Sequence, residues 1–412
     1  MSRKIIDYLR LPMEKSLYNY LSNSINFPFI KFLTEKERTL YGDRRSREMK
    51  GVAIYLSKNL FPELDKISQE IKEKLDIKDE IEVYITNSAE TNAFSIYKEN
   101  KEAKHIIGLH SSVIERFSHE ELKFIIGHEL GHILLQHQSL SEAIKFVFPD
   151  PSSMPSYFQL FYILWRQLSE ISADFVGLIV TESPDVAIKT LFKLHLGVSN
   201  ENIEMNKIKN YVDKIYEKYD SFFNRDTHPP LPLRLKILIA FSESKLFSSL
   251  KHGETDLKKA NASLKKLEEI ALKLTKFPEN GFESAYVAFI INAGLLIAAC
   301  DKEITKDEME QIVSLVSYFI DPLLCKELTD INQITQEKLE KPAKFLSENF
   351  PETLDAVFQD LILVSLADRR LKDEEVEMLF LIGEKMLNLP IDRIISIFRR
   401  TLQRYFKPGF YI

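Results

Sequence analysis

The chain of 412 residues contains only two cysteines, Cys300 and Cys325. Their spacing matches neither a zinc knuckle nor a redox pair, so a disulfide framework is excluded and both are predicted to be buried free thiols. No long basic run occurs and the formal net charge is −6, so nothing favours a nucleic acid partner. The N-terminal residues show no apolar stretch followed by a small-residue cleavage site, which predicts a cytoplasmic protein.

Long apolar runs are also missing, since none reaches the roughly 20 residues that a membrane-spanning helix needs. The most apolar window, 285–300, contains Asn292 and Gly294 and is predicted to be a buried helix. A second apolar region, 146–165, is interrupted by prolines and cannot be one continuous helix. We expect no spanning segment, and 146–165 is the candidate for peripheral membrane contact.

Hydrophobic periodicity changes along the chain. Residues 1–75 follow the three-and-four spacing of amphipathic helices, and 81–110 hold short β-branched and aromatic runs that predict a small antiparallel sheet. Ser118 and Glu121 have capping-box spacing before an apolar run, which predicts that a long helix starts at Ser118. The predicted fold class is α+β and predominantly helical.

The stretch 127–137 holds three of the nine histidines, a glutamate and two glycines within an apolar run. On a helix, positions four residues apart share a face, so His128 and His132 project together and can bind one Zn²⁺. Glu129 is rotated by ~100° from His128, which places its carboxylate beside the metal, where it can take a proton from water. Histidines packed in a core are the alternative until a third ligand is found.

The third ligand has two candidates. His137 lies nine residues after His128, about half a turn out of phase on a continuing helix, so it is predicted to face away as a surface or packing residue. Glu170 is the better candidate, since it shares one face of a second helix with Asp174. Asp174 would then accept a hydrogen bond from the outer N–H of a metal-binding histidine. A solvated acidic face is the alternative, yet the neighbouring residues are apolar.

Four motifs occur together: TNAFSI at 91–96, HELGH, EISAD, and THPPLPLR at 227–234. In this order they resemble the gluzincin metallopeptidases of the HtpX-like and CAAX-prenyl-protease type, metallopeptidase family 48. The resemblance covers roughly residues 50–245. It implies a zincin-type domain that binds one zinc ion per chain and hydrolyses peptide bonds in protein or peptide substrates.

The resemblance also implies roles for single residues. His228 would be catalytic as a hydrogen-bond donor to the oxyanion, with capping of the turn at Pro229 and Pro230 as the alternative. The other implied residues are the zinc ligands His128, His132 and Glu170, the general base Glu129, the supporting residues Asp174 and Arg234, and the substrate-binding residues Asn92, Ala93 and Phe94.

Segment 146–165 stands where members of this family carry membrane helices. Because it is broken by prolines, it is predicted to be a loop or lid over the cleft. Many members of the family carry spanning helices around the catalytic motifs and no such helix is expected here, so the sequence does not favour membrane-embedded or prenylated substrates.

The composition changes again after residue 245. Residues 1–250 are predicted to form the peptidase domain, with N-terminal helices over 1–75 and a catalytic core over 76–245. Residues 251–281 predict an amphipathic connecting helix and 282–412 an all-α repeat domain. Within that domain 299–312 match 366–379 at an offset of 67 residues, and the match pairs Asp301 with Asp368, Ile304 with Leu371 and Glu308 with Glu375.

Both copies of the repeat resemble the TerB-like helical domain of tellurite-resistance proteins, which implies a regulatory or partner-binding module. Thr305 and Glu308 have capping-box spacing, so helix capping explains the acidic residues, with metal binding as the alternative. A calcium EF-hand is excluded because the loop lacks the required glycine and alternating oxygen ligands.

The sequence thus predicts a cytoplasmic zinc endopeptidase whose C-terminal domain regulates it or binds a protein partner. The alternative from another class is a latent or inactive peptidase-like protein that acts through its C-terminal domain. The intact ligand set and Glu129 argue against that alternative.

Overall fold

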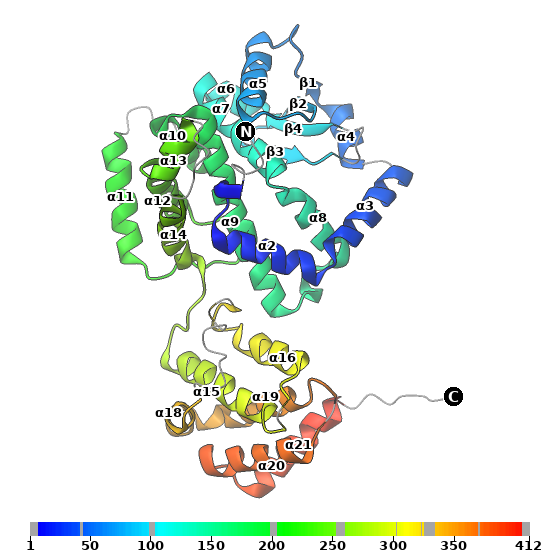
Figure 1. The fold of residues 1–412 in the computed structure, drawn as a ribbon, viewed down its shortest axis with the longest axis vertical. Coiled ribbons are helices and arrows are strands. Elements are labelled where there is room, and N and C mark those ends of the chain that lie inside the picture. Colours follow the sequence, from blue (N-terminus) through cyan, green and yellow to red (C-terminus); the bar gives the residue numbers. More distant parts are fainter. Residues whose placement is uncertain are drawn as a thin grey trace. The chain divides into compact units, whose positions relative to one another are not determined.

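The computed structural model describes residues 7–41, 44–98, 104–197, 204–252, 260–301, 303–322, 324, 334–369 and 371–405 (Figure 1). The chain divides into two compact units. The first consists of Met1–Met154 and Phe161–Leu274, and the second of Pro155–Leu160 and Thr275–Ile412. Cys300 is a free, half-buried thiol, whereas Cys325 lies outside the described residues.

The first unit contains a sheet of β1 (Ile54–Tyr55), β2 (Ile81–Thr86), β3 (Ala93–Ile96) and β4 (His105–His110) in the order β1-β2-β4-β3. The predicted antiparallel sheet is wrong, because β2 and β4 are parallel while the two outer pairs are antiparallel. The chain passes from β2 to the far edge before β4 inserts between β2 and β3. β3 is therefore an edge strand, and among the described residues no other strand pairs with its outer side.

The rest of the first unit is mostly helical, and its helices pack on the sheet or on one another. They are α2 (Pro12–Ser24), α3 (Phe27–Tyr41), α4 (Arg44–Val52), α5 (Pro62–Leu75), α6 (Ser111–Arg116), α7 (His119–Leu134), α8 (His137–Val147), α9 (Ser156–Thr181), α10 (Pro184–Leu196), α11 (Met205–Lys218), α12 (Leu231–Ser242), α13 (Lys245–Lys251) and α14 (Ala260–Ala271). The predicted connecting helix is α14, which packs on α12 and α2 within this unit.

Helix α7 is central, since it contacts β3 and β4 and packs beside α5 and α10. The predicted start at Ser118 is confirmed. The Ser118 N–H donates to Glu121 Oε2 at 2.8 Å, and the Glu121 N–H donates to Ser118 Oγ at 3.4 Å. These two reciprocal hydrogen bonds satisfy the backbone N–H groups of Ser118 and Glu121 and fix where the motif helix begins.

The predicted loop or lid over 146–165 is wrong. This segment contains the last residues of α8 and the first residues of α9, and its prolines all precede α9. Phe158, Phe161 and Tyr162 are buried. Phe161 packs edge-on against Tyr20, and the Tyr162 hydroxyl lies 2.6 Å from Ser141 Oγ. These aromatic side chains are core residues.

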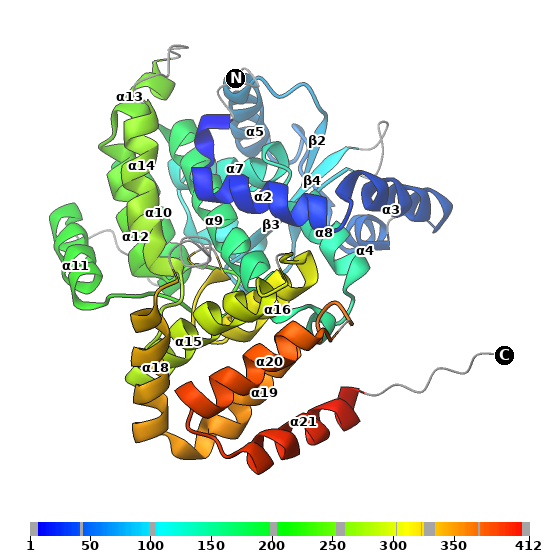
Figure 2. The ribbon, with the colours of Figure 1, turned by 60° about the horizontal axis from the view of Figure 1, so that its bottom comes forward.

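The regular elements described in the second unit's C-terminal part are all helical (Figure 2). They are α15 (Gly281–Ala298), α16 (Lys306–Val316), α18 (Gln336–Asn349), α19 (Leu354–Ser365), α20 (Asp373–Leu381) and α21 (Ile391–Tyr405). The predicted buried helix is α15, whose Phe289 and Ile290 lie fully buried in the core. Among the described residues it alone is long and apolar enough to span a membrane, yet most of it is buried.

The acidic residues of the repeat cap helices. The Thr305 N–H donates to Glu308 Oε2 at 2.7 Å, and the Glu308 N–H donates to Thr305 Oγ1 at 3.2 Å. In the second copy the Lys372 N–H donates to Glu375 Oε2 at 2.8 Å. Lys372 also forms an ion pair with Asp301 of the first copy, so the two copies contact each other through these loops.

Candidate metal centre and active-site pocket

Helices α7 and α9 cross at close contact, and glycines of the motif make this possible. A Cβ atom on Gly131 would lie 2.9 Å from the Cα of Ala173, and one on Gly127 would lie 3.1 Å from the Cα of Gly177. Any larger residue would push the helices apart. Since each glycine precedes a histidine of the motif, this packing sets the separation between those histidines and Glu170 on α9.

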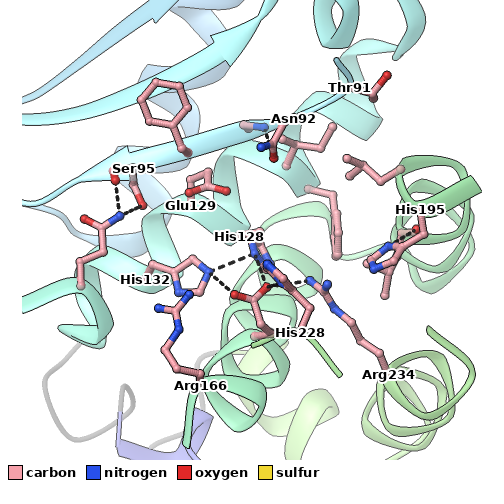
Figure 3. Close-up of a pocket in the computed structure, with 18 residues that line it drawn as sticks. Thr91, Asn92, Ser95, His128, Glu129, His132, Arg166, His195, His228 and Arg234 are labelled. Atoms are coloured by element: carbon pink, nitrogen blue, oxygen red, sulfur yellow. Dashed lines mark hydrogen bonds and ion pairs between the residues drawn. The ribbon is translucent and has the colours of Figure 1, made fainter. Parts of the chain in front are cut away.

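Three side chains converge at the crossing (Figure 3). His128 Nε2 lies 3.2 Å from His132 Nε2, and the two nitrogens lie 3.5 Å from Glu170 Oε2 and Oε1 respectively. Two nitrogens and one carboxylate oxygen within 4.8 Å of one another can hold a metal ion. Among the described residues, this is the one such group of histidine, cysteine and carboxylate side chains.

Asp174 lies behind His128, on the side away from this group. Its Oδ1 accepts a hydrogen bond from His128 Nδ1 at 2.9 Å. Arg234 of α12 holds the same carboxylate with two bonds, from Nη2 to Oδ1 at 2.8 Å and from Nε to Oδ2 at 2.5 Å. Because Asp174 and Arg234 are both buried, this fork fixes the imidazole plane of His128.

The charges in the group are set by burial and by these contacts. Burial lowers the pKa of His128, but its bonds with Asp174 and Glu170 outweigh burial and raise that pKa to about 10. Burial lowers the pKa of His132 well below its usual range. A metal ion that bound to Nε2 of His128 would therefore have to displace a proton from that nitrogen.

Glu129 lies beside the group, between α7 and β3 (Figure 3). It is only 7% exposed, and burial raises the pKa of its carboxyl above the ordinary value, partly offset by the charge of His128 and a hydrogen bond with Ser95. A carboxyl with a raised pKa is a stronger base than an exposed one once it is ionised.

His228 comes from the segment before α12 and reaches the group from the open side. Its Nδ1 lies 3.2 Å from Glu170 Oε2, and its side chain is 60% exposed. Arg234 Nη2 lies 3.4 Å from the same oxygen. Nε2 of His228 is thus the nitrogen left to face a substrate.

The prediction that His137 faces away from the site is wrong, whereas the predicted role as a packing residue agrees with its full burial. Helix α7 ends at Leu134, Gln136 takes a left-handed conformation with φ of 55°, and α8 begins at His137. The reversal turns His137 back toward the group, where it is fully buried and its Nδ1 lies 3.0 Å from Nδ1 of His132. His137 contacts a candidate ligand from behind and is not itself one of the three converging side chains.

A pocket of about 380 Å³ opens over the three side chains. Asn92 and Ala93 line it from the edge strand. Phe94 lines it as well, although its ring packs toward Gly108 and Met49.

One wall of the pocket was not predicted from the sequence. It is apolar and is formed by Phe124, Ile125, Leu191 and Leu194. Phe124 and Ile125 lie four and three residues before His128 on α7, so helical spacing alone could have identified them. The two leucines belong to α10 and carry no local signal.

The chain is similar in sequence to known metallopeptidases. Residues 58–241 match the family model described as Peptidase family M48. The chain is 25% identical over 282 residues to plastoglobule-localized metallopeptidase 48, a chloroplastic protein of Arabidopsis thaliana; the alignment covers 62% of this chain and 76% of that protein. No solved structure matches the chain. The TerB-like resemblance of residues 282–412 stays a prediction.

Proposed function

Since residues 58–241 make this chain a member of peptidase family M48, we propose that it is a zinc-dependent endopeptidase that hydrolyses protein substrates, with Glu129 as general base. The observation that carries the proposal is the convergence of His128, His132 and Glu170 beside that buried carboxylate.

The spacing of the converging atoms fits zinc. Tetrahedral zinc with bonds of about 2.0–2.1 Å keeps its ligand atoms roughly 3.3 Å apart. Here the two Nε2 atoms lie 3.2 Å apart, and each of them lies 3.5 Å from a different oxygen of Glu170. When bound, zinc would acidify water and polarise the scissile carbonyl. Asp174 would support His128, and Arg234 would hold Asp174 in place.

Two further side chains, Glu129 and His228, act on the reacting groups. Glu129 takes the proton of the attacking water and returns it to the leaving amine. His228, anchored to Glu170 through Nδ1 at 3.2 Å, directs Nε2 to the oxyanion that forms on the carbonyl.

The free edge of β3 provides the place for the substrate. An extended peptide adds to such an edge through main-chain hydrogen bonds, here at Asn92, Ala93 and Phe94. An antiparallel peptide runs from the Ser95 end toward the Asn92 end, and Figure 3 shows His195 of α10 at the latter end. The apolar wall, which includes Leu191 and Leu194 of the same helix, therefore receives the residue after the cleaved bond.

This direction predicts a preference for a large apolar residue after the cleaved bond. Burying a leucine side chain contributes about 1.5–3 kcal/mol, so we expect leucine there to raise kcat/KM at least tenfold over alanine in otherwise identical peptides. Leu194→Ser should remove most of this difference. Leu196→Ser is the matched control, because Leu196 lies on the same helix and is 50% exposed. An equal loss of kcat/KM on the leucine and alanine peptides in Leu194→Ser would contradict the proposal that this wall binds the residue after the cleaved bond.

Metal removal tests the proposed function itself. We expect one zinc ion per chain and cleavage of an unfolded protein such as reduced casein, abolished by a chelator and restored by added zinc. The alternative is a latent or inactive peptidase-like protein that acts through its C-terminal domain. A metal-loaded chain that leaves casein intact would favour this alternative, and cleavage that survives metal removal would rule out the zinc mechanism.

We further propose that the enzyme is cytoplasmic and that the second unit binds a protein partner or regulates the peptidase. Within its described residues there is no group of three metal-ligating side chains. Its last helix, α21, exposes apolar side chains at Ile391, Ile395 and Leu402, which a partner protein could cover.

A further inference from the structure

A chain of buried polar groups runs from the metal site to the N-terminal helix α2. His132 Nδ1 lies 3.0 Å from His137 Nδ1, and His137 Nε2 lies 3.0 Å from Glu14 Oε1. Glu14 and His137 are both 0% exposed. Two fully buried polar side chains in series, away from water, indicate a contact that the fold maintains.

One assignment of protons satisfies every contact in this chain. If Nε2 of His132 faces the metal, its proton is on Nδ1 and is donated to Nδ1 of His137. The remaining nitrogen of His137, Nε2, then carries a proton and donates it to the carboxylate of Glu14. The carboxylate end of the series thus determines which nitrogen of His132 is free to bind a metal.

Glu14 is itself held from two directions. Its second oxygen accepts a hydrogen bond from the Ser172 hydroxyl on α9, and Arg10 Nε lies 3.5 Å from its first oxygen. Ser172 lies two residues after the candidate ligand Glu170. The N-terminal helix is therefore connected to both of the helices that provide ligands.

We propose that Glu14 and His137 are positioning residues that fix the tautomer and ring orientation of His132 for metal binding. Each ligand histidine then has its own carboxylate, Asp174 directly for His128 and Glu14 through His137 for His132. Through Glu14, helix α2 becomes a functional part of the metal site. This helix lies outside residues 58–241, which match the family. This inference rests on the proposed zinc site.

Two substitutions of Glu14 separate positioning from packing. Glu14→Gln keeps an amide oxygen that accepts from His137 and an amide group that can bond with Ser172, whereas Glu14→Leu removes both bonds at similar volume. Partners that orient ligands typically change metal affinity 10- to 100-fold. We expect a loss of that size in zinc affinity for Glu14→Leu and a change of less than about threefold for Glu14→Gln.

Leu17→Ala is the matched control, because Leu17 lies on the same helix and is 1% exposed but has no polar contact with the site. It should lower the melting temperature of the metal-free protein and leave zinc affinity unchanged. Competition with a chelating dye measures affinity, and the visible absorption of bound Co²⁺ reports ligand geometry. The Co²⁺ spectrum should change in Glu14→Leu and stay as in the wild type in Glu14→Gln and Leu17→Ala.

Three results would overturn the proposal. They are wild-type zinc affinity and Co²⁺ spectrum in Glu14→Leu, equal losses in both Glu14 variants, or an equal loss in Leu17→Ala. Because these measurements need no substrate, they are independent of peptidase activity. A wild-type chain that binds zinc but cleaves nothing would refute the proposed function and leave this inference standing.

Discussion

Replacing Glu129 with glutamine is expected to lower kcat by about 10²- to 10⁴-fold, the usual contribution of a general base, while zinc content and fold are retained. Glutamine has the same shape but no basicity, and Glu129 is not one of the three converging ligand side chains. Its burial and raised pKa favour the proton-accepting role that we propose for it.

The measurement is single-turnover cleavage of a fluorogenic peptide, with zinc determined on the same sample. Glu120→Gln is the control, because Glu120 is an exposed carboxylate in the first turn of the same helix and should be silent. Undiminished cleavage by Glu129→Gln would refute the proposed mechanism. Loss of zinc in that variant would instead place Glu129 among the ligands.

Replacing His228 with alanine is expected to lower turnover by about 10²- to 10³-fold, the typical loss for one oxyanion donor. Zinc stoichiometry and melting temperature should hardly change, because the side chain is 60% exposed and contacts Glu170 through Nδ1 only. The effect should appear in kcat more than in KM, since the bond forms in the transition state.

Thr227→Ala is the control for this experiment, as Thr227 is the exposed preceding residue. A His228→Ala variant that loses zinc together with activity would show that the imidazole mainly supports Glu170. Normal turnover in that variant would leave only the capping of the proline turn as its role.

Local features of the sequence predicted part of this structure. The convergence of His128 and His132, and the helix start at Ser118, follow from spacings of three and four residues on one helix. Sheet order depends on contacts between distant segments, so alternating patterns indicated strands but not that β2 and β4 are parallel. The prolines of 146–165 do interrupt the helical structure, because α8 ends at Val147 and α9 begins at Ser156, but no local pattern shows that the residues after them are core and not a lid.

The surroundings of His132 could not be predicted for a similar reason. No glycine or proline marks the left-handed Gln136 where α7 ends, so a continuing helix placed His137 on the wrong side. Glu14 contacts His137 across 123 positions of sequence. A single glutamate in an N-terminal amphipathic helix carries no pattern that distinguishes it from a solvent-exposed one.

The polar groups at the site come from positions as far apart as Glu14 on α2 and Arg234 on α12. During synthesis, a chain that ends before residue 234 lacks the fork that holds Asp174, and Glu14 lacks its partners His137 and Ser172 until α8 and α9 have been made. Contacts this distant in sequence form late and together. The contacts that support the metal-binding group are therefore complete only once α12 has been synthesised.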